Sequence, residues 1–135
     1  MRLVLDTNVL VSGLFFSGPP HEVLDAWRGG KVQLVVSSEI LEEYFRVAED
    51  LSSNHSGIDY QSFLDLLSMR SMFVVAPSLT EEVCEDPDDD KFLACALASR
   101  TRTICSGDKA LLRASGYKGV AVLTPRQLVD RHLKE

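Results

Sequence analysis

The sequence has little of several features that mark whole classes of proteins, cysteine first among them. Its 135 residues include three cysteines, Cys84, Cys95 and Cys105, an odd number without a CxxC pair. This pattern predicts neither a disulfide framework nor a zinc knuckle, and we expect buried, reduced thiols. A reducing, cytoplasmic environment follows from that expectation.

Long apolar runs are also missing. No stretch approaches the roughly 18 to 20 apolar residues that a helix needs to span a bilayer, so no membrane segment is predicted. Residues 1–16 are largely apolar, but Asp6 and Asn8 interrupt them where a signal peptide would be continuous, and no small-residue cleavage pattern follows. We therefore expect this segment to be part of the fold.

Positive charge is scarce, since 14 Lys and Arg stand against 20 Asp and Glu, for a net charge of −6. This balance argues against a protein whose affinity rests on a basic surface, such as a histone-like DNA binder. With 45% hydrophobic and 25% charged residues, the composition is that of a globular chain. The length suits one compact domain, and we expect residues 1–135 to form it.

What the sequence does contain is an alternation of strand-like and helix-like segments. Apolar runs typical of strands buried in a parallel sheet occupy residues 2–5, 32–36, 73–76, 103–105 and 120–123. Segments with helical spacing occupy residues 19–28, a stretch from 37 or 38 onward, 59–72, 89–100 and 125–133. The polar stretch 52–57, with a solvated His55, is expected to be a loop. The alternation predicts a three-layer α/β/α fold with a central, mostly parallel sheet of about five strands.

Two aspartates stand directly after predicted strands. Asp6 follows the first strand, and Asp108 follows the fourth in the motif Ser106-Gly107-Asp108, where the glycine allows a tight exit. The carboxyl ends of parallel strands share one edge of a sheet, where ligands collect, so both acids are candidates for a binding site. The alternative is that each caps the helix that follows it, a role worth about 1 kcal/mol.

Two more acids come from helical segments. In the helical segment that starts at residue 37 or 38, a rotation of about 100° per residue puts Glu43 at the edge of the apolar stripe and Glu42 on nearly the opposite side. The run DPDDD at residues 86–90 precedes a strongly apolar helix, and Asp89 continues the apolar stripe of that helix. Asp90, the next residue around the same helix, is the second candidate for the site acid in this run. The alternative for Glu43 is an ordinary residue at the boundary of the apolar stripe. The alternative for the DPDDD run is a solvated acidic turn favoured by the helix dipole.

Carboxylates gathered in one pocket repel one another, so such a cluster predicts a bound cation. Hard oxygen ligands without a neighbouring Cys or His set favour Mg²⁺ or Mn²⁺ over Zn²⁺. A hard divalent cation on rigid carboxylates suits phosphoryl chemistry, because it polarises the phosphate and stabilises charge on the leaving oxygen.

Four motifs in a fixed order give this pattern a family resemblance. They are DTN at residues 6–8, SEILEEY at 38–44, DPDD at 86–89 and SGDK at 106–109. In this order they resemble the PIN-domain family, in the group of VapC-like toxins of bacterial and archaeal toxin–antitoxin pairs, over essentially the whole chain. The resemblance implies a ribonuclease that hydrolyses RNA phosphodiesters with Mg²⁺ or Mn²⁺, forms a homodimer and is inhibited by a cognate antitoxin protein.

The resemblance also implies roles for single residues. Asp6 is the central metal ligand, and Asp89 and Asp108 complete the metal site. Glu43 binds the metal or orients the attacking water. Polar support for these acids, or else helix capping and turn formation, is expected from three further side chains, Thr7, Asn8 and Ser106.

Two other functions fit part of this pattern. One is a Mg²⁺-dependent phosphatase with Asp6 as nucleophile, but haloacid-dehalogenase-like enzymes have DxD at that place, and this sequence has Asn8 as the third residue. The other is a non-catalytic RNA-binding or protein-interaction module with the same fold. The presence of all four acids argues against it.

The negative net charge conceals a polarity along the chain. Residues 1–90 carry five basic and seventeen acidic side chains, whereas residues 91–135 carry nine basic and three acidic ones. The basic residues near two of the candidate acids are candidates for a border that guides an RNA backbone, or else for ordinary solvated helix surface. They are Lys91, Arg100, Arg102, Lys109, Arg113 and Lys118.

Aromatic side chains offer stacking surfaces for bases, although core and dimer-interface positions are more usual for them. The candidates are Phe15, Phe16, Trp27 and Tyr44. Phe15 and Phe16, next to Ser17-Gly18, are expected to be the exposed pair, with dimer contacts nearby and around the helix that starts at Pro19.

Overall fold

Five parallel strands form the centre of the protein. The computed structural model describes residues 1–53 and 59–134. The strands are β1 (Arg2–Leu5), β2 (Gln33–Val36), β3 (Met72–Phe73), β4 (Thr103–Cys105) and β5 (Ala121–Leu123). Their order across the sheet is β3-β2-β1-β4-β5, and every pairing is parallel. The predicted α/β/α fold with a central parallel sheet is confirmed.

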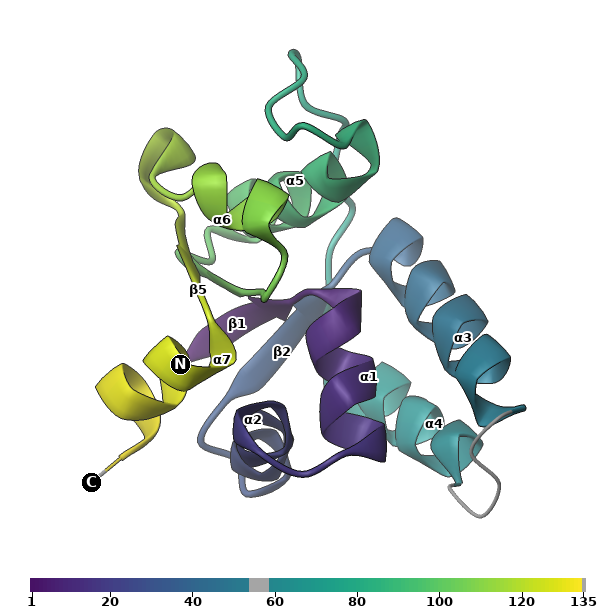
Figure 1. Cartoon of the computed structure of the whole chain (residues 1–135). Helices are drawn as coiled ribbons and strands as arrows, with labels where there is room; N and C mark the ends of the chain where they lie inside the picture. The colour runs from purple at the N-terminus through teal and green to yellow at the C-terminus, as the bar shows by residue number, and fades with distance from the viewer. Residues whose placement is uncertain (54–58, 135) are drawn as a thin grey trace.

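Helices connect the strands and cover both faces of the sheet. They are α1 (Thr7–Phe15), α2 (Pro19–Arg28), α3 (Ser38–Ser52), α4 (Tyr60–Arg70), α5 (Asp90–Ser99), α6 (Lys109–Arg113) and α7 (Pro125–Leu128). Short 3-10 turns lie at Pro87–Asp89 (η1) and Tyr117–Gly119 (η2), and a π-helical turn at Val129–Leu133 (η3) follows α7. In Figure 1, α5 and α6 lie above the central strands, and α1, α2, α4 and α7 lie below them.

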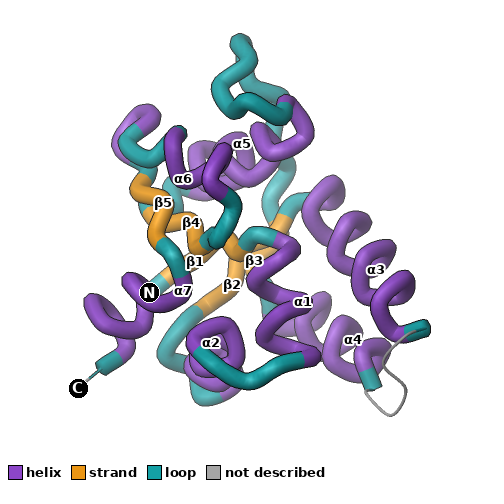
Figure 2. The backbone as a smooth tube through the Cα atoms, in the orientation of Figure 1, coloured by secondary structure: helices purple, strands orange, loops and turns teal. Residues whose placement is uncertain are grey.

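The order of the strands explains this arrangement. From β1 the chain moves outward through β2 to the edge strand β3, and it then returns to β4 and β5 on the other side of β1. Right-handed crossovers in opposite directions put their helices on opposite faces of the sheet. The direction changes between the neighbours β1 and β4, near the middle of the sheet in Figure 2. Loops diverge at such a switch point and leave a crevice at the carboxyl ends of the strands, the usual binding place in open α/β sheets.

The central strands are as apolar as a sheet covered on both faces requires. Leu3, Val4 and Leu5 of β1 are fully buried, as are Ile104 and Cys105 of β4. Helix α5 packs against β1, β2 and β4. Burial of these side chains holds β1 and β4 rigidly, so the residues that follow them have fixed positions.

Local capping sets the ends of several helices where the sequence predicts them. Ser37 accepts a hydrogen bond from the Ile40 N–H at the start of α3, and Asp59 accepts one from Ser62 at the start of α4. Thr124 forms a reciprocal capping box at the start of α7.

Two predicted elements are shorter than expected. The strand predicted at 73–76 is limited to Met72 and Phe73, because β3 is an edge strand whose pairing with β2 stops at Phe73. The helix predicted at 125–133 is α-helical only to Leu128 and continues as the π-helical turn. Within the predicted loop 52–57, residues 54–57, including His55, lie outside the described residues.

The cysteines, and two of the four aromatic side chains considered for stacking on bases, lie in the core. All three cysteines are free and buried, as expected. Trp27 packs edge-on against Phe63 with ring centroids 5.4 Å apart, and Tyr44 is fully buried. Phe16 is 58% exposed. None of the helices in the described part of the chain is both long and apolar enough to cross a lipid bilayer.

The contact between α1 and α2 gives a test of the fold. A Cβ atom at Gly13 would lie 2.6 Å from the Pro20 carbonyl oxygen and 2.8 Å from Leu24 Cδ1, so Gly13→Ala must push the two helices apart. We expect a loss of about 1–3 kcal/mol in the free energy of unfolding, measured in urea. The control is Gly29→Ala, where the nearest atom lies 3.4 Å away. Equal stabilities of the two variants would contradict this packing.

Candidate functional site

Asp6 is the most buried of the four candidate acids, with 4% of its surface exposed. Its backbone N–H donates to the Cys105 carbonyl at 2.9 Å, and the Ser106 hydroxyl donates to Asp6 Oδ2 at 2.5 Å. Asp6 stands at the N-cap position of α1. Burial raises the pKa of Asp6, the Ser106 hydrogen bond and a hydrogen bond from the backbone of Asn8 in that helix oppose this rise, and the charges of Asp108 and Glu43 add to it.

Asp108 both caps a helix and faces the other acids. Its Oδ1 accepts from the Ala110 N–H at 3.1 Å at the start of α6, so the capping alternative is right for this residue. Its own N–H donates to Ser106 Oγ at 3.0 Å. Ser106 therefore contacts Asp6 and Asp108 at once, and a carboxylate that caps with one oxygen still has a second for a ligand.

Asp89 ends the turn η1 and lies half-buried beside Asp108. Burial, a hydrogen bond shared with Asp108, and the charges of Asp108 and Asp6 raise the pKa of Asp89 to about 7. Like charges brought this close favour a proton on one of the two carboxyls. Asp89, Asp108 and Asp6 thus form a cluster of acids with unfavourable charge repulsion.

Glu43 reaches this region from α3, and both of its carboxylate oxygens have partners. Oε2 accepts a hydrogen bond from the Thr7 hydroxyl, and Oε1 lies 2.9 Å from Lys91 Nζ and 3.7 Å from the Arg46 guanidinium. The side chains of Glu43 and Lys91 are each 14% exposed. Burial lowers the pKa of Lys91, but its hydrogen bonds to Glu43 and Asp88 outweigh burial and raise the pKa overall.

The neighbours of these acids have other contacts. Asp90 accepts from the N–H groups of Val83 and Cys84 at 3.1 and 2.8 Å, which holds the loop before η1. Glu42 is exposed on the outer side of α3, as its position in the helical stripe predicts. The structure therefore brings Asp89, rather than Asp90, next to Asp6 and Asp108.

The four acids supply the oxygen ligands that Mg²⁺ or Mn²⁺ prefers. Among residues 1–53 and 59–134, no three His, Cys, Asp or Glu side chains already surround an ion position. Glu43 is instead turned toward Lys91 and Thr7. Burial first, and then the charges of neighbouring carboxylates, raise the pKa of Asp6 and of Asp89, and a bound cation would oppose both effects. The donor set therefore fits a hard divalent cation.

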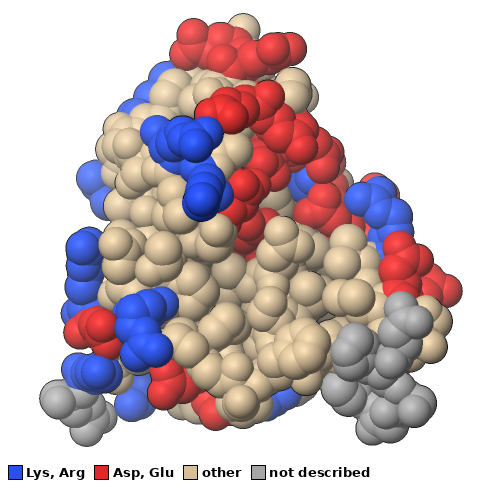
Figure 3. Space-filling model, in the orientation of Figure 1, with Lys and Arg blue, Asp and Glu red and all other residues tan. Residues whose placement is uncertain are grey.

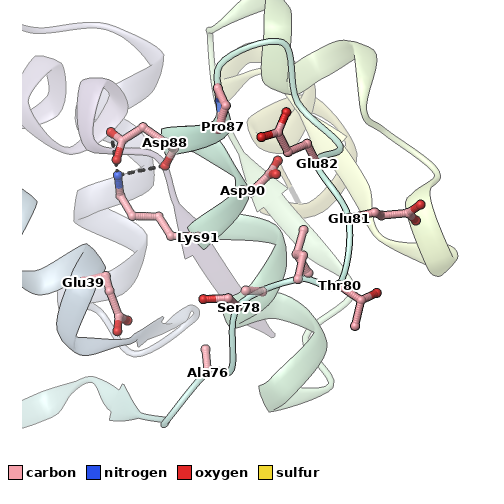
Figure 4. A pocket seen from close by; sticks show the side chains of 12 residues that line it. Glu39, Ala76, Ser78, Thr80, Glu81, Glu82, Pro87, Asp88, Asp90 and Lys91 are labelled. Carbon is pink, nitrogen blue, oxygen red and sulfur yellow. Dashed lines mark hydrogen bonds and ion pairs between the residues drawn. The ribbon is translucent and has the colours of Figure 1, made fainter.

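Two grooves lie near the candidate acids, one of them lined in part by Asp108 and the other by Asp88 and Asp90, the chain neighbours of Asp89. One, of about 300 Å³, lies beside Asp108 and is lined by neutral residues that include Asn8, Ser12 and Gly107. The other, of about 460 Å³, lies between α3, α5 and the loop before η1, and Lys91 and Asp88 form part of its wall (Figure 4). On the face shown in Figure 3, acidic side chains form a band over the segment that leads into α5, whereas basic side chains line the left side.

The polar residues predicted to support the acids have different roles. Thr7 and Ser106 donate hydrogen bonds to Glu43 and Asp6, as the resemblance implies. Asn8 is exposed and lines the groove beside Asp108.

The contact between Lys91 and Glu43 is the feature that sequence reasoning missed. The sequence makes Lys91 a candidate for a basic border or for solvated helix surface, and its i, i+3 spacing from Asp88 is a local signal of pairing. Glu43 lies 48 positions away. Arg113 of the expected border likewise pairs with Glu85.

Comparisons with known proteins agree with the architecture and with the order of the motifs. A sequence model described as "PIN domain" matches residues 2–110, a range that contains all four acids. An uncharacterized protein of Methanocaldococcus jannaschii is 31% identical over 115 residues, which cover 83% of this chain and 74% of that protein. The crystal structure of VapBC2 from Rickettsia felis, bound to a DNA fragment from their promoter, contains a similar fold. It matches with a TM-score of 0.58 and 15% identity, over 92% of this chain and 98% of that one.

The raised pKa of Asp89 predicts that the stability of the folded protein depends on pH, which can be measured without a substrate. In the unfolded chain this carboxyl takes the ordinary value of 3.8, so metal-free folded protein loses stability as the pH rises from about 4 to about 7. We expect a loss on the order of 1 kcal/mol, because water screens a half-exposed group. Urea unfolding in EDTA across this range measures it.

Asp89→Asn should remove this part of the pH dependence. The control is Asp65→Asn on the exposed side of α4, which should leave the profile of the wild type unchanged. Parallel stability profiles for the wild type and Asp89→Asn would contradict the assigned repulsion.

Proposed function

Since this chain belongs to the PIN-domain family, we propose that it is a metal-dependent endoribonuclease that hydrolyses RNA phosphodiester bonds. The observation that carries the proposal is the cluster of Asp6, Asp89 and Asp108 at the switch point of the sheet, with mutual repulsion that a divalent cation would relieve. We further propose that the protein is the toxin of a toxin–antitoxin pair and acts in the cytoplasm.

The residues of the cluster have distinct roles in this proposal. Asp6, Asp89 and Asp108 would hold Mg²⁺ or Mn²⁺, which would supply a Lewis acid for the phosphate and lower the pKa of water. Glu43 orients the attacking water or binds the metal. Ser106 holds Asp6 and Thr7 holds Glu43, so both carboxylates keep fixed directions toward the substrate.

The groove beside Asp108 supports a path for the RNA strand. Its volume of about 300 Å³ suits part of a nucleotide, and it opens next to a proposed metal ligand. Its described lining includes the amide of Asn8 and the hydroxyl of Ser12, which can bind base or sugar edges. No Lys or Arg is among the described residues that line it. We therefore assign this groove to a base or sugar rather than to a phosphate.

The partners in this proposal are an antitoxin protein and a second copy of the chain. The similar structure from Rickettsia felis contains VapBC2 with DNA from their promoter. By analogy, an antitoxin would cover the acidic cluster and keep the nuclease inactive.

Cleavage of a mixed RNA pool with Mg²⁺ or Mn²⁺ tests the nuclease. We expect Asp6→Asn and Asp108→Asn to lower the rate by about 100-fold or more, or ~2.7 kcal/mol of transition-state stabilisation. Asparagine also caps helices, so Asp108→Asn keeps the start of α6. A wild type that is inert with metal and free of antitoxin, or variants that cut equally well, would refute the proposal.

Two neighbouring glutamates provide a matched control. Glu43→Gln should lower cleavage strongly, whereas Glu42→Gln, one residue away on the exposed side of α3, should not change it. A phosphorylated Asp6 trapped during turnover would instead indicate the phosphatase. RNA binding with no cleavage by the wild type would indicate a non-catalytic module.

The proposed dimer predicts an effect at Phe16. This exposed side chain lies just before α2, and burial of a phenylalanine contributes about 1.5–3 kcal/mol. Phe16→Ser should therefore weaken the dimer by about 10- to 100-fold in sedimentation experiments. The control is Phe73→Ser on the edge strand β3, which is also exposed. A monomeric wild type would exclude the homodimer. A larger effect of Phe73→Ser than of Phe16→Ser would indicate that the interface lies at β3 instead.

A further inference from the structure

Lys91 is surrounded by oxygen atoms in the way that a bound cation would be. Its Nζ lies 2.9 Å from Glu43 Oε1, 2.9 Å from Asp88 Oδ2 and 3.0 Å from the Asp88 carbonyl oxygen. Figure 4 shows the tip of Lys91 against Asp88, at the wall of the larger groove. The side chain is only 14% exposed, so this ammonium is a fixed part of the site.

The contact divides the acids into two groups. Glu43 and Asp88 share the positive charge of Lys91. Asp6, Asp89 and Asp108 have no ion pair with Lys or Arg among the described side chains. Only the second group therefore carries uncompensated negative charge.

Glu43, in addition, already has a hydrogen-bond partner on each of its carboxylate oxygens. Oε1 is held by Lys91 and Oε2 by the Thr7 hydroxyl. A metal ion on Glu43 would compete with these partners, and loss of the charge-assisted hydrogen bond to Lys91, which is mostly buried, costs more than the loss of an exposed one.

We propose that Lys91 is a positioning residue that takes the place of a second cation, so that the site binds one divalent ion through Asp6, Asp89 and Asp108. This inference rests on the proposed metal-dependent nuclease. Lys91 neutralises Glu43 and fixes its direction, and Glu43 then acts on the attacking water and not as a metal ligand. Without Lys91, Glu43 and Asp88 present two adjacent carboxylates to which a second divalent ion binds.

Counting the bound ions tests this inference. Metal-free full-length protein is titrated with Mn²⁺, with calorimetry and the electron paramagnetic resonance of free Mn²⁺ as readouts. We expect one ion per chain for the wild type and for Lys91→Arg, and two for Lys91→Met. Lys118→Met removes the same charge from an exposed position away from the cluster and should bind one ion.

Two further variants keep the test independent of Lys91 itself. Glu43→Gln should leave the affinity for the first ion within about threefold of the wild type, whereas Asp108→Asn should weaken it by 10-fold or more. Two ions in the wild type, one ion in folded Lys91→Met, or a large loss of affinity in Glu43→Gln would each overturn the role of Lys91. A wild type that binds no Mn²⁺ would instead overturn the proposed metal-dependent function.

Discussion

The hydrogen bond from Ser106 to Asp6 joins residues that are 100 positions apart, and the geometry of the site depends on it. It forms because β1 and β4 are adjacent and end level, with Leu5 opposite Cys105. A carboxylate as buried as Asp6 needs a donor, and Ser106 provides it. The same hydroxyl oxygen accepts from the Asp108 N–H, so one side chain fixes two acids relative to the sheet.

The acids of the site carry more negative charge than the neighbouring basic residue compensates, and the compensation is unequal among them. Lys91 compensates Glu43 of α3 and Asp88 of η1, whereas Asp89 at the end of η1 and the acids that follow β1 and β4 keep their repulsion. Repulsion by Asp108 and Asp6 is part of what raises the pKa of Asp89 to about 7, together with its burial. The fold tolerates this cost in a rigid sheet, and a bound cation would recover it. A cation bound by Asp89 and Asp108 would favour their ionised forms.

The sequence was sufficient for features that depend on periodicity. Apolar runs located the strands, and the stripe on the second long helix separated Glu43 from Glu42. Contacts between segments that are distant in the chain could not be predicted from the sequence. The choice of Asp89 over Asp90 agrees with the stripe, but its physical reason is that Asp90 binds the N–H groups of Val83 and Cys84. Likewise β3 stops after Phe73 because its neighbour β2 ends at Val36, opposite Phe73, which the apolar run does not reveal.

The distribution of charge also limits how RNA can bind under the proposed function. Of the basic residues near the cluster, Lys91 and Arg113 are already paired with acids, while Lys109 is exposed beside Asp108. A phosphate that approaches the unpaired acids without a cation is repelled, so the ion must bind before the RNA backbone does. Discrimination among RNAs must come from neutral contacts, and the groove that contains Asn8 is positioned to make them.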